Sequence, residues 1–526
     1  MSLPTRAEKQ GPKGRGSGRR GLLGRWMAAR LWKLTALTAL LRLGPLASAQ
    51  PLRNEASPWE SSVVTVEVAR KQYDYYQPWT RKDIRVQKPG LVVGEGEILT
   101  TAEETYNRTL VRLQKGGRGR WWLGEVKWVD YHANLALVST SESEFWRGLK
   151  PATLGGAIPP DGTLQVLRWR AGNLENRKAE FTQFAVREAQ LAAISHVVLE
   201  ADSDIQNAGW GEPIVANGHV VGLLRAQDAR TCMAIPAAFI KANLEAHRQG
   251  HYRGLGYFHF YWQPAQNPAT LALLKLPGEP RGVIVIQVPE RPDHGDAVLK
   301  PQDIILSIDG FALDIQGDYK DPEYGHLMLE NLATRGKWAG DEVKMQIWRE
   351  GKAMEVAYRL PKYNYSTTLV PFGTYDQEPE YMIVGGLVFQ PLTDSYLQSW
   401  GTDWRRRAPF RLNHYRDEPP TRERTGLVVL SQVLPDPYNI GYQEQKYLVV
   451  DKVNGQLISH LPDLKAALQK PANGYHVIEF MQSDSLRRMV LSADGNEQEA
   501  TTRILKRYHI EQPFLFAGES AKTAER

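Results

Sequence analysis

Cysteine is almost missing from this chain of 526 residues, which contains only Cys232. A single cysteine excludes an internal disulfide, and its apolar surroundings, TCMAIP, predict a buried hydrophobic residue rather than a thiol nucleophile. Also absent are the Cys-x-x-Cys, H-E-x-x-H, P-loop and G-x-S-x-G motifs. His247 and His251 are four residues apart, but Gly250 between them predicts a helix end, so we expect two solvated histidines. We therefore expect no cofactor and no metal.

The chain has no broad excess of positive charge either. Its formal net charge is +6, but residues 1–49 hold ten Lys or Arg and one acidic residue. The remainder holds 55 of the 65 basic and 58 of the 59 acidic side chains, a net charge of −3. The clusters RWRAGNLENRK and DWRRRAPFR are local, and we expect them to be solvated. A nucleic-acid partner is therefore not expected, because such binding requires an extended basic surface.

Long apolar runs are confined to the N-terminus. There a basic region precedes LTALTALLRLGPLA and the small residues Ala47-Ser48-Ala49, which is the pattern of a signal peptide with an A-x-A cleavage site. The apolar run is short and contains Arg42, so it does not predict a stable membrane span. We expect residues 1–49 to be a cleaved signal peptide and the mature chain to be exported, to the periplasm or the extracellular space.

Between about residues 61 and 224, short β-rich runs alternate with turns. Runs such as SVVTVEV, GLVVGEGEILT, NLALV and PIVANGHVVGLL show the period-two alternation of many short strands, which favours a sandwich or a barrel. The following AIPAAFIKANLEAHRQG has helical spacing and ends at Gly250. We therefore predict a β domain over residues 61–250, closed by a helix, after a linker at residues 50–60.

Three segments of this domain resemble those that carry the catalytic triad of HtrA/DegP-type (Deg) serine proteases. The segment ILTTAEET resembles ILTNAHVV, DYHANLALV resembles the segment with DLALL, and QNAGWGEPI resembles part of DAxINPGNSGGPL. The resemblance implies a chymotrypsin-type pair of six-stranded barrels. At the positions of the family's histidine, aspartate and serine this chain has Glu103, Asn134 and Trp210.

All three substitutions remove the chemistry of a serine protease. That chemistry requires a hydroxyl nucleophile, an imidazole that takes and returns its proton, and an anion that orients the imidazole. Trp210 has no hydroxyl, Glu103 is a carboxylic acid with an ordinary pKa of ~4.3, and neutral Asn134 does not stabilise an imidazolium. We therefore predict a pseudoenzyme of the trypsin-like fold, without catalytic residues.

Residues 252–363 resemble the PDZ domain that follows the protease in HtrA proteins, down to the string LKPQDIILSIDG. In such domains a peptide C-terminus adds as a strand while backbone N–H groups of a loop hold its carboxylate. The corresponding loop here consists of Tyr257, Phe258, His259 and Phe260. Because His259 stands in place of the usual glycine, either its Cβ restricts the loop or its ring donates to the carboxylate.

A second, divergent copy follows at residues 364–510, with an insert at residues 395–424 and a tail at residues 511–526. Its candidate peptide-binding loop consists of Gly386, Leu387, Val388 and Phe389. The Trp- and Arg-rich insert predicts a surface loop or short helices. The tandem resembles the plant and algal Deg branch with one regular and one degenerate PDZ-like domain. The predicted fold class is therefore mainly β: a chymotrypsin-type double β-barrel followed by two PDZ-like α+β domains.

The predicted function is that of an exported HtrA/Deg-like pseudoprotease of protein quality control. Its partners would be peptides, unfolded protein segments or protein C-termini, bound by a scaffold or a modulator. Two alternatives stay open: an active serine-type endopeptidase with an unrecognised catalytic set, and a structural assembly subunit. We also expect a homo-oligomer. The aromatic residues Tyr73, Tyr75, Tyr76 and Trp79 pack either between subunits, as N-terminal aromatics do in HtrA trimers, or within their own domain.

Overall fold

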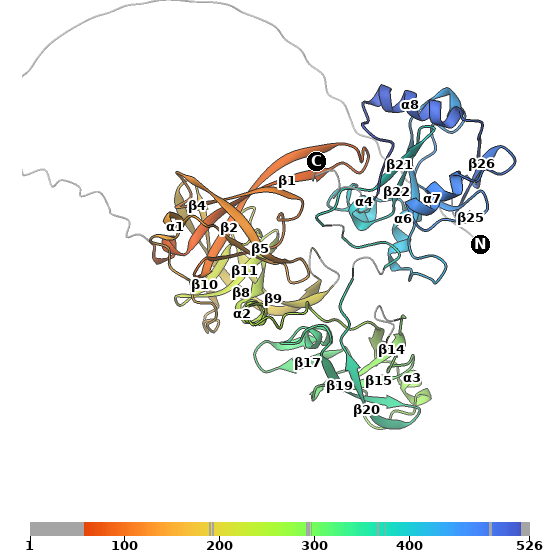
Figure 1. The fold of residues 1–526 in the computed structure, drawn as a ribbon. Coiled ribbons are helices and arrows are strands. Elements are labelled where there is room, and N and C mark those ends of the chain that lie inside the picture. The colour runs from red at the N-terminus through yellow and green to blue at the C-terminus, as the bar shows by residue number, and fades with distance from the viewer. Residues whose placement is uncertain are drawn as a thin grey trace, which may run out of the picture. The chain divides into compact units, whose positions relative to one another are not determined.

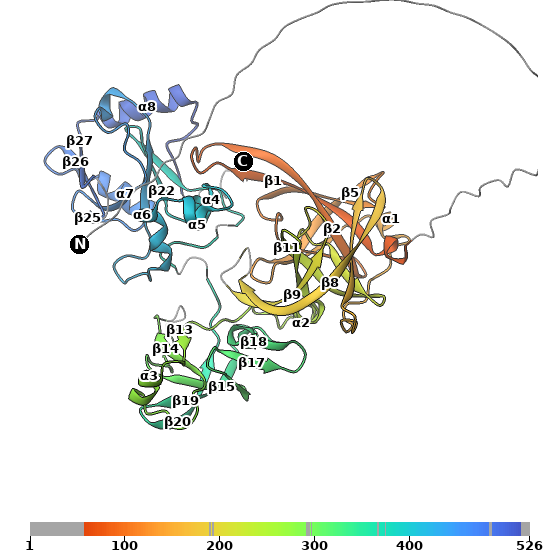
Figure 2. The same cartoon turned by 180° about the vertical axis from the view of Figure 1, so that it is seen from behind.

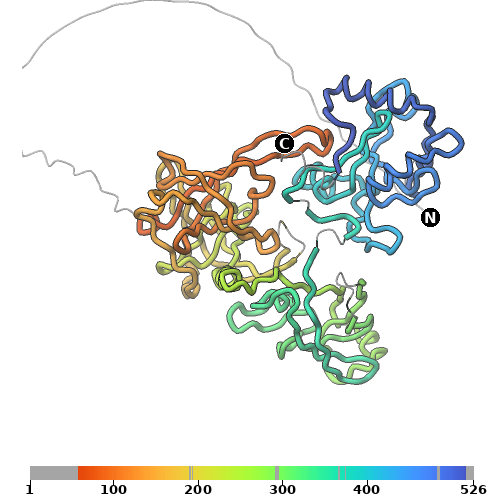
Figure 3. The backbone as a smooth tube through the Cα atoms, viewed as in Figure 1, coloured from red at the N-terminus to blue at the C-terminus, as the bar shows by residue number. Residues whose placement is uncertain are grey.

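The computed structural model describes residues 57–188, 191, 194–290, 295, 297–364, 368–373, 375–482 and 486–516. The predicted signal peptide lies outside the described residues. Residues 56–526 cluster as one compact unit. In Figure 3 the backbone passes first through two barrels, in red to yellow, then through one PDZ-like module in green and a second one in blue. The fold is mainly β, as the sequence predicts.

Six antiparallel strands close the first barrel in the order β1-β2-β3-β6-β5-β4. They are β1 (Val63–Tyr73), β2 (Arg81–Gly94), β3 (Glu97–Thr100), β4 (Arg108–Lys115), β5 (Trp121–Asp130) and β6 (Leu135–Ser139). The 3-10 turn η1 (Pro58–Ser61) precedes the barrel and helix α1 (Ser143–Trp146) follows it. Val64, Val66 and Val68 alternate along β1 and fill the core, because alternate side chains of a strand share one face. Figure 1 and Figure 2 show β1 and β2 running on past the barrel as a two-stranded ribbon.

The second barrel has the strand order β10-β11-β12-β9-β8-β7. Its strands are β7 (Thr163–Arg170), β8 (Asn173–Glu188), β9 (Ser195–Ser203), β10 (Pro213–Ala216), β11 (His219–Asp228) and β12 (Thr231–Pro236). Cys232 lies fully buried in its core, as predicted, and burial raises the pKa of the thiol to about 11. The thiol is therefore protonated at neutral pH and is not a nucleophile.

Helix α2 (Ala237–Arg248) closes the barrel domain and ends where the sequence predicts. Gly250, just beyond it, has a φ of 71°, the left-handed conformation in which glycine commonly ends helices. His247 is half-buried and stacks on Trp128 of β5, with 4.7 Å between ring centroids. The expectation of a solvated histidine is therefore wrong for His247, because the last turn of the helix docks on an indole. His251 is exposed.

The first PDZ-like module is an antiparallel sheet in the order β13-β14-β15-β19-β20. Its strands are β13 (Tyr261–Pro264), β14 (Val283–Gln287), β15 (Ile304–Ile308), β16 (Phe311–Ala312), which pairs with β15, β19 (Glu342–Arg349) and β20 (Lys352–Arg359). Helix α3 (Pro268–Leu273) follows β13, and a hairpin of β17 (Asp318–Asp321) and β18 (Gly325–Met328) leads to the 3-10 turn η2 (Leu329–Ala333).

The second PDZ-like module is a longer sheet in the order β27-β26-β24-β23-β22-β21-β28. Its strands are β21 (Tyr381–Val384), β22 (Leu387–Pro391), β23 (Val428–Val433), β24 (Leu448–Val453), β25 (Gln456–Leu457), β26 (Tyr475–Phe480), β27 (Arg488–Ser492) and β28 (Phe514–Leu515). Its other elements are η5 (Pro437–Asn439), α7 (Leu461–Leu468) and α8 (Asn496–Tyr508). Because β28 pairs with β21, the sheet reaches into the stretch that the sequence predicts as a tail.

The insert between β22 and β23 folds into short helices. They are α4 (Asp394–Gln398), α5 (Trp404–Arg407), α6 (Phe410–Asn413) and the 3-10 turn η4 (His414–Asp417). Ala408 and Leu412 are buried in a small core together with Tyr396, so the insert is anchored. Among the described residues, no helix is both long enough and apolar enough to cross a bilayer. The longest helix, α8, has 13 residues.

Candidate functional site

Three loops carry Glu103, Asn134 and Trp210, the residues that the sequence resemblance places at the triad positions. Glu103 follows β3 and Asn134 precedes β6 in the first barrel, while Trp210 lies in the loop of residues 204–212 that leads into β10 of the second barrel. The backbone N–H of Glu103 donates to the side-chain oxygen of Asn134 at 3.0 Å. Asn134 has a φ of 52°, which asparagine tolerates better than most residues do. The structure thus brings Glu103 and Asn134 into direct contact.

Gly211, the neighbour of Trp210, packs against the end of β3, which leads into the Glu103 segment. Gly211 has a φ of 110°, and a Cβ at this position would lie 3.1 Å from the Thr100 hydroxyl oxygen and 3.4 Å from the Thr101 nitrogen. The loop therefore packs against the end of β3 in a way that favours glycine. The Trp210 indole is half-buried and joins none of the hydrophobic clusters formed by the described residues.

The backbone N–H groups of this loop are occupied by side chains of the chain itself. Gly209 and Trp210 both donate to one carboxylate oxygen of Glu212, at 2.9 and 2.8 Å. The N–H of Ala208 donates to the side-chain oxygen of Gln227 at 2.9 Å. Glu212 is only 2% exposed, and burial raises its pKa although the two N–H groups favour the carboxylate form. A carboxyl oxygen of the chain itself thus lies where the loop presents its donors.

Arg168 of β7 holds the same loop from its other side. Its guanidinium donates to the carbonyl oxygens of Gln206 and Asn207 at 2.9 and 3.2 Å and lies 4.0 Å from the second carboxylate oxygen of Glu212. Glu175 of β8 orients this guanidinium at 2.8 Å. The loop is therefore fixed by hydrogen bonds to its N–H groups on one side and to its carbonyl groups on the other.

A buried lysine supports the Glu103 segment. Lys88 of β2 is 2% exposed, and its ammonium donates to the Thr101 carbonyl oxygen at 2.7 Å, the Thr101 hydroxyl at 2.7 Å and the Glu103 carbonyl oxygen at 2.6 Å. Burial lowers the pKa of Lys88, while the negative charges of Glu103, Glu104 and Glu212 oppose that fall. Three hydrogen bonds use all three hydrogens of the ammonium group. Lys88 thus fixes the backbone around the substituted histidine position.

Arg225 is a second buried cation at this site. It lies in β11 at a register shift between Leu224 and Ala226, and such β-bulges redirect a side chain. The side chain is 2% exposed and donates to the Glu188 carbonyl oxygen at 3.0 Å. Burial lowers the pKa of Arg225 to about 10, and the charge of Glu103 opposes this shift. Four ionisable groups, Lys88, Glu103, Glu212 and Arg225, therefore occupy the region where the family carries its triad.

Sequence reasoning missed Lys88, Glu212 and Arg225. Lys88 and Arg225 each stand beside runs of apolar residues, in RVQKPGLVV and HVVGLLRAQ, and a single cation in a buried strand is a usable signal. Glu212 stands where the pattern DAxINPGNSGGPL has a glycine, next to the substituted serine. This replacement of a glycine by a glutamate was the clearest sign in the sequence that the backbone N–H groups of Gly209 and Trp210 have a partner within the chain.

Replacing Glu103 with glutamine is expected to change how stability depends on pH. Burial raises the pKa of the Glu103 carboxyl, and the Lys88 ammonium opposes that rise only in part. Between the ordinary pKa and the raised one, the folded chain holds a proton that the unfolded chain has lost. The free energy of unfolding of the wild type therefore falls as pH rises through this window, and Glu103→Gln lacks this contribution.

Urea denaturation at about pH 4 and about pH 8 measures the difference, since these values lie below the ordinary pKa of the carboxyl and above the raised one. We expect the wild type to lose more free energy of unfolding between them than Glu103→Gln, by up to about 1.4 kcal/mol per unit of pKa shift. Glu125→Gln, at an exposed residue of β5, is the control and should behave as the wild type. Equal losses in all three chains would show that Glu103 titrates normally.

The predicted carboxylate loop of the first PDZ-like module is engaged with its own domain. The backbone N–H of His259 donates to the Tyr358 hydroxyl at 2.9 Å. The imidazole lies 3.1 Å from the Tyr257 hydroxyl and 3.1 Å from the Glu290 carbonyl oxygen. His259 does not appear among the residues with positive φ, so its Cβ fits the loop without strain. This N–H and this ring therefore already have partners on the chain.

The second predicted peptide-binding loop, Gly386–Phe389, lies at a strand that is already paired along both edges. Leu387, Val388 and Phe389 belong to β22, which pairs with β21 on one side and with β23 on the other. Gly386 lies in the preceding turn with a φ of 90°, where a Cβ would come within 2.3 Å of the Leu434 carbonyl oxygen. The expectation that a peptide pairs along Gly386–Phe389 is therefore wrong, because the preceding strand β21 occupies one edge of β22 and the distant strand β23 occupies the other.

The predicted aromatic run packs against the second PDZ-like module of the same chain. Tyr75 contacts Tyr396 with 6.4 Å between ring centroids, and Tyr76 contacts Trp400 at 5.8 Å. Trp79 contacts Tyr381 at 6.1 Å. The two expected alternatives were packing between subunits and packing within the barrel domain. The structure places Tyr75, Tyr76 and Trp79 against another module of the same chain, so packing confined to the barrel domain is wrong, and packing between subunits stays a prediction.

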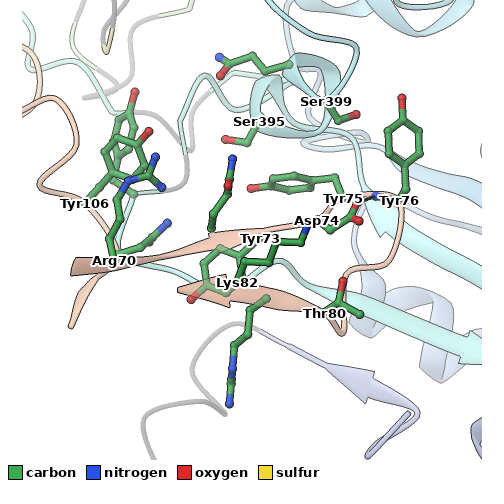
Figure 4. A pocket seen from close by; sticks show the side chains of 15 residues that line it. Arg70, Tyr73, Asp74, Tyr75, Tyr76, Thr80, Lys82, Tyr106, Ser395 and Ser399 are labelled. Atoms are coloured by element: carbon green, nitrogen blue, oxygen red, sulfur yellow. Dashed lines mark hydrogen bonds between the residues drawn. The ribbon is translucent and has the colours of Figure 1, made fainter. Parts of the chain in front are cut away.

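A polar hollow of about 450 Å³ lies beside this aromatic contact. Figure 4 shows side chains from the β1–β2 ribbon and from α4 converging on it. Residues that line it include Arg70, Tyr73, Tyr75, Lys82, Tyr106 and Ser395. Arg70 also pairs with Glu104, the residue after Glu103, so the wall of the hollow is continuous with the substituted site.

Comparisons with known proteins agree with this architecture. The PDZ domain family profile matches residues 370–514. Among relatives from Arabidopsis thaliana, putative protease Do-like 13 is 26% identical over 420 residues, which cover 78% of this chain and 80% of the relative. Protease Do-like 2, chloroplastic, is 26% identical over 439 residues, covering 80% and 70%. Putative protease Do-like 3, mitochondrial, is 25% identical over 462 residues, covering 86% and 78%.

Solved structures that match part of this chain include the HtrA-type protease AlgW with a decapeptide. That structure is 15% identical in sequence, with a TM-score of 0.44, and the match covers 58% of this chain and 96% of that one. The Rv3671c protease from M. tuberculosis, in its active form, is 18% identical with a TM-score of 0.30, and the match covers 35% and 80%.

Proposed function

We propose that this chain, whose homologues are Deg/HtrA-like proteases with a PDZ domain, is an exported pseudoprotease that binds peptides without cleaving them. Its ligands would be extended segments of unfolded proteins or protein C-termini. It would act as a scaffold or as a modulator of other proteins in its compartment. The barrel domain would then act as a rigid structural part of the protein and would not catalyse peptide cleavage.

The observation that carries this proposal is the Glu212 carboxylate on the N–H groups of Gly209 and Trp210. In acyl transfer, N–H groups at the nucleophile turn stabilise the developing oxyanion, and the loss of one such donor costs about 10²- to 10³-fold in rate. Here both groups already donate to a carboxyl oxygen of the chain itself. A scissile carbonyl oxygen or an oxyanion would find neither N–H group free there.

The alternative of an active endopeptidase has one specific candidate pair, Lys88 and Thr101. The ammonium lies 2.7 Å from the hydroxyl, as a lysine base would in a Ser-Lys type of site. However, the two carbonyl oxygens and the charges of Glu103, Glu104 and Glu212 favour the ammonium form of Lys88, and an ammonium does not accept the hydroxyl proton. Thr101 is also completely buried. Both features argue against a lysine-activated nucleophile.

The proposed peptide-binding surface is the outer edge of β13. This strand ends the sheet of the first PDZ-like module, so one of its edges is available for an added strand. Tyr261 of β13 is 55% exposed, and its ring favours hydrophobic peptide residues beside it. Since the N–H of His259 already binds Tyr358, the added strand would gain its affinity from the edge more than from its carboxylate.

Purified chain beginning at Gln50 is expected to leave unfolded casein intact and to show no labelling by a fluorophosphonate probe. The reason is that Trp210 supplies no hydroxyl and that Glu212 occupies the loop donors. Gel analysis and intact-mass spectrometry measure the two outcomes. Specific labelling of a serine or threonine of the barrel domain would overturn the proposal. If labelling is lost in Thr101→Val, the Lys88–Thr101 pair is the catalytic set.

Peptides with hydrophobic C-terminal residues are expected to bind the same chain weakly, with Kd values in the ~micromolar range. Fluorescence anisotropy with a peptide library measures the affinity. Tyr261→Glu should weaken binding because it places a charge beside the β13 edge, whereas Met354→Glu on β20, at the opposite end of the sheet, should not. If no peptide binds, or if both variants bind equally, the assembly-subunit alternative replaces peptide binding.

A further inference from the structure

The insert of the second PDZ-like module carries an exposed phenylalanine surrounded by arginines. Phe410, the first residue of α6, is 82% exposed, the most exposed large hydrophobic side chain among the described residues. It follows three arginines of α5 and precedes a fourth in α6. We call this set the Phe410 patch; it consists of Arg405, Arg406, Arg407, Phe410 and Arg411.

The frame beneath the Phe410 patch is anchored, so the exposure of the ring is built into the fold. Ala408 is 7% exposed and Leu412 is completely buried, and both pack in the core of the insert. Phe410 lies midway between these anchors and therefore points outward. An exposed phenylalanine held in place in this way loses free energy in water, since burial of such a ring is worth about 1.5–3 kcal/mol. The loss would be recovered by a partner that accepts the ring.

Two arginines of the Phe410 patch, Arg405 and Arg406, have largely exposed side chains. Arg405 lies 3.4 Å from Glu188 and Arg406 lies 3.8 Å from Asp403, and both arginine side chains are more than half exposed. Exposed pairs of this kind contribute little and exchange readily with other anions. The segment DWRRRAPFRLNHYR holds five arginines and one acidic residue, whereas residues 50–526 as a whole carry a net charge of −3. Positive charge is thus concentrated around the exposed ring.

We propose that the Phe410 patch docks on an anionic lipid surface. Phe410 would enter the boundary between headgroups and acyl chains, and Arg405, Arg406 and Arg407 would contact lipid phosphates. A protruding ring needs no complementary cavity in a bilayer, and each arginine near an anionic membrane contributes about 1 kcal/mol. The chain would then be held at the membrane surface without crossing it.

Two observations favour a bilayer over a nucleic acid. His414 stacks on the Phe410 ring with 5.5 Å between centroids and an interplanar angle of 22°, and the ring is still 82% exposed. Binding of a nucleic-acid strand uses successive aromatic side chains on which bases stack, whereas the Phe410 patch has one ring. Insertion into lipid requires only one exposed apolar side chain beside cationic groups.

Vesicle flotation tests the proposal with the chain beginning at Gln50, which lacks the apolar N-terminal run. The described residues belong to one compact unit that starts at Ala56, so this chain retains them all. Vesicles of phosphatidylcholine alone and vesicles with about one third phosphatidylglycerol are compared at low and high salt. We expect binding only to the anionic vesicles and release at high salt, because screening weakens the arginine contacts.

Two variants and their controls locate the contact. Phe410→Ser should weaken the partition coefficient about five- to tenfold through the loss of buried ring area, and Arg406→Glu with Arg407→Glu should abolish binding. Leu273→Ser, at a residue 76% exposed on α3, and Lys344→Glu with Lys352→Glu on β19 and β20 are the matched controls and should bind as the wild type. Circular dichroism confirms that each variant is folded.

The proposal is overturned if the wild type does not float with anionic vesicles, or if the Phe410→Ser and arginine variants float unchanged. It is also overturned if the chain does not bind vesicles but binds a fluorescent oligodeoxythymidine through Phe410, Arg405, Arg406 and Arg407. That result would make the Phe410 patch a surface that binds single-stranded nucleic acid. Binding to both vesicle types with equal strength would overturn the role of the arginines.

Discussion

A chain that carries Glu103→His, Asn134→Asp and Trp210→Ser together is expected to stay unreactive toward a fluorophosphonate probe. These substitutions supply the nucleophile, the base and the orienting anion, but Glu212 still occupies the N–H groups of residues 209 and 210. Adding Glu212→Gly frees both donors, and we expect labelling to rise by about 100-fold over the triple variant. Intact-mass spectrometry after a fixed exposure measures the labelled fraction.

Two controls separate the effect of Glu212 from that of a general loosening of the barrel. Glu212→Gly alone should remain unlabelled, because Trp210 has no hydroxyl. Asp228→Gly, at an exposed acidic residue at the end of β11, should not increase labelling when it is added to the triple variant. If the triple variant is labelled as fast as the fourfold variant, Glu212 does not obstruct the N–H groups.

The second large effect is expected for Lys88→Met, which should lower the free energy of unfolding by about 3–5 kcal/mol. Methionine has a similar length but no hydrogens to donate. The Thr101 hydroxyl and the carbonyl oxygens of Thr101 and Glu103 would lose their common donor inside the barrel, and an unpaired buried group costs about 1–3 kcal/mol. Urea denaturation followed by tryptophan fluorescence measures the change.

Lys127→Met is the matched control for this substitution. Lys127 lies on β5 with its side chain 56% exposed and pairs only with exposed Glu125. Its replacement should change the free energy of unfolding by less than about 0.5 kcal/mol. A Lys88→Met variant as stable as the control would show that the three hydrogen bonds contribute nothing to the folded state.

Local sequence patterns correctly predicted those features that depend on residues close together in the sequence. The period-two runs predicted strands, Gly250 predicted the end of α2, and the apolar context of Cys232 predicted its burial. They failed where a contact comes from far along the chain. His247 was expected in solvent because the stretch around it is polar, but it stacks on Trp128, over a hundred residues earlier. Gly386 resembles part of a binding loop, but β23 closes that edge.

The amino-acid sequence by itself determined that Glu103, Asn134 and Trp210 stand in the three segments that resemble the triad segments of Deg proteases, and that none of the three side chains is an imidazole or a hydroxyl. That follows from side-chain chemistry alone. Only the tertiary structure decided which groups surround these residues. Closure of the barrels turns Lys88 and Arg225 inward, and the fold of one short loop directs the Glu212 carboxylate onto two backbone N–H groups. The direction of a side chain in a closed barrel depends on strand register and bulges, which no local pattern specifies.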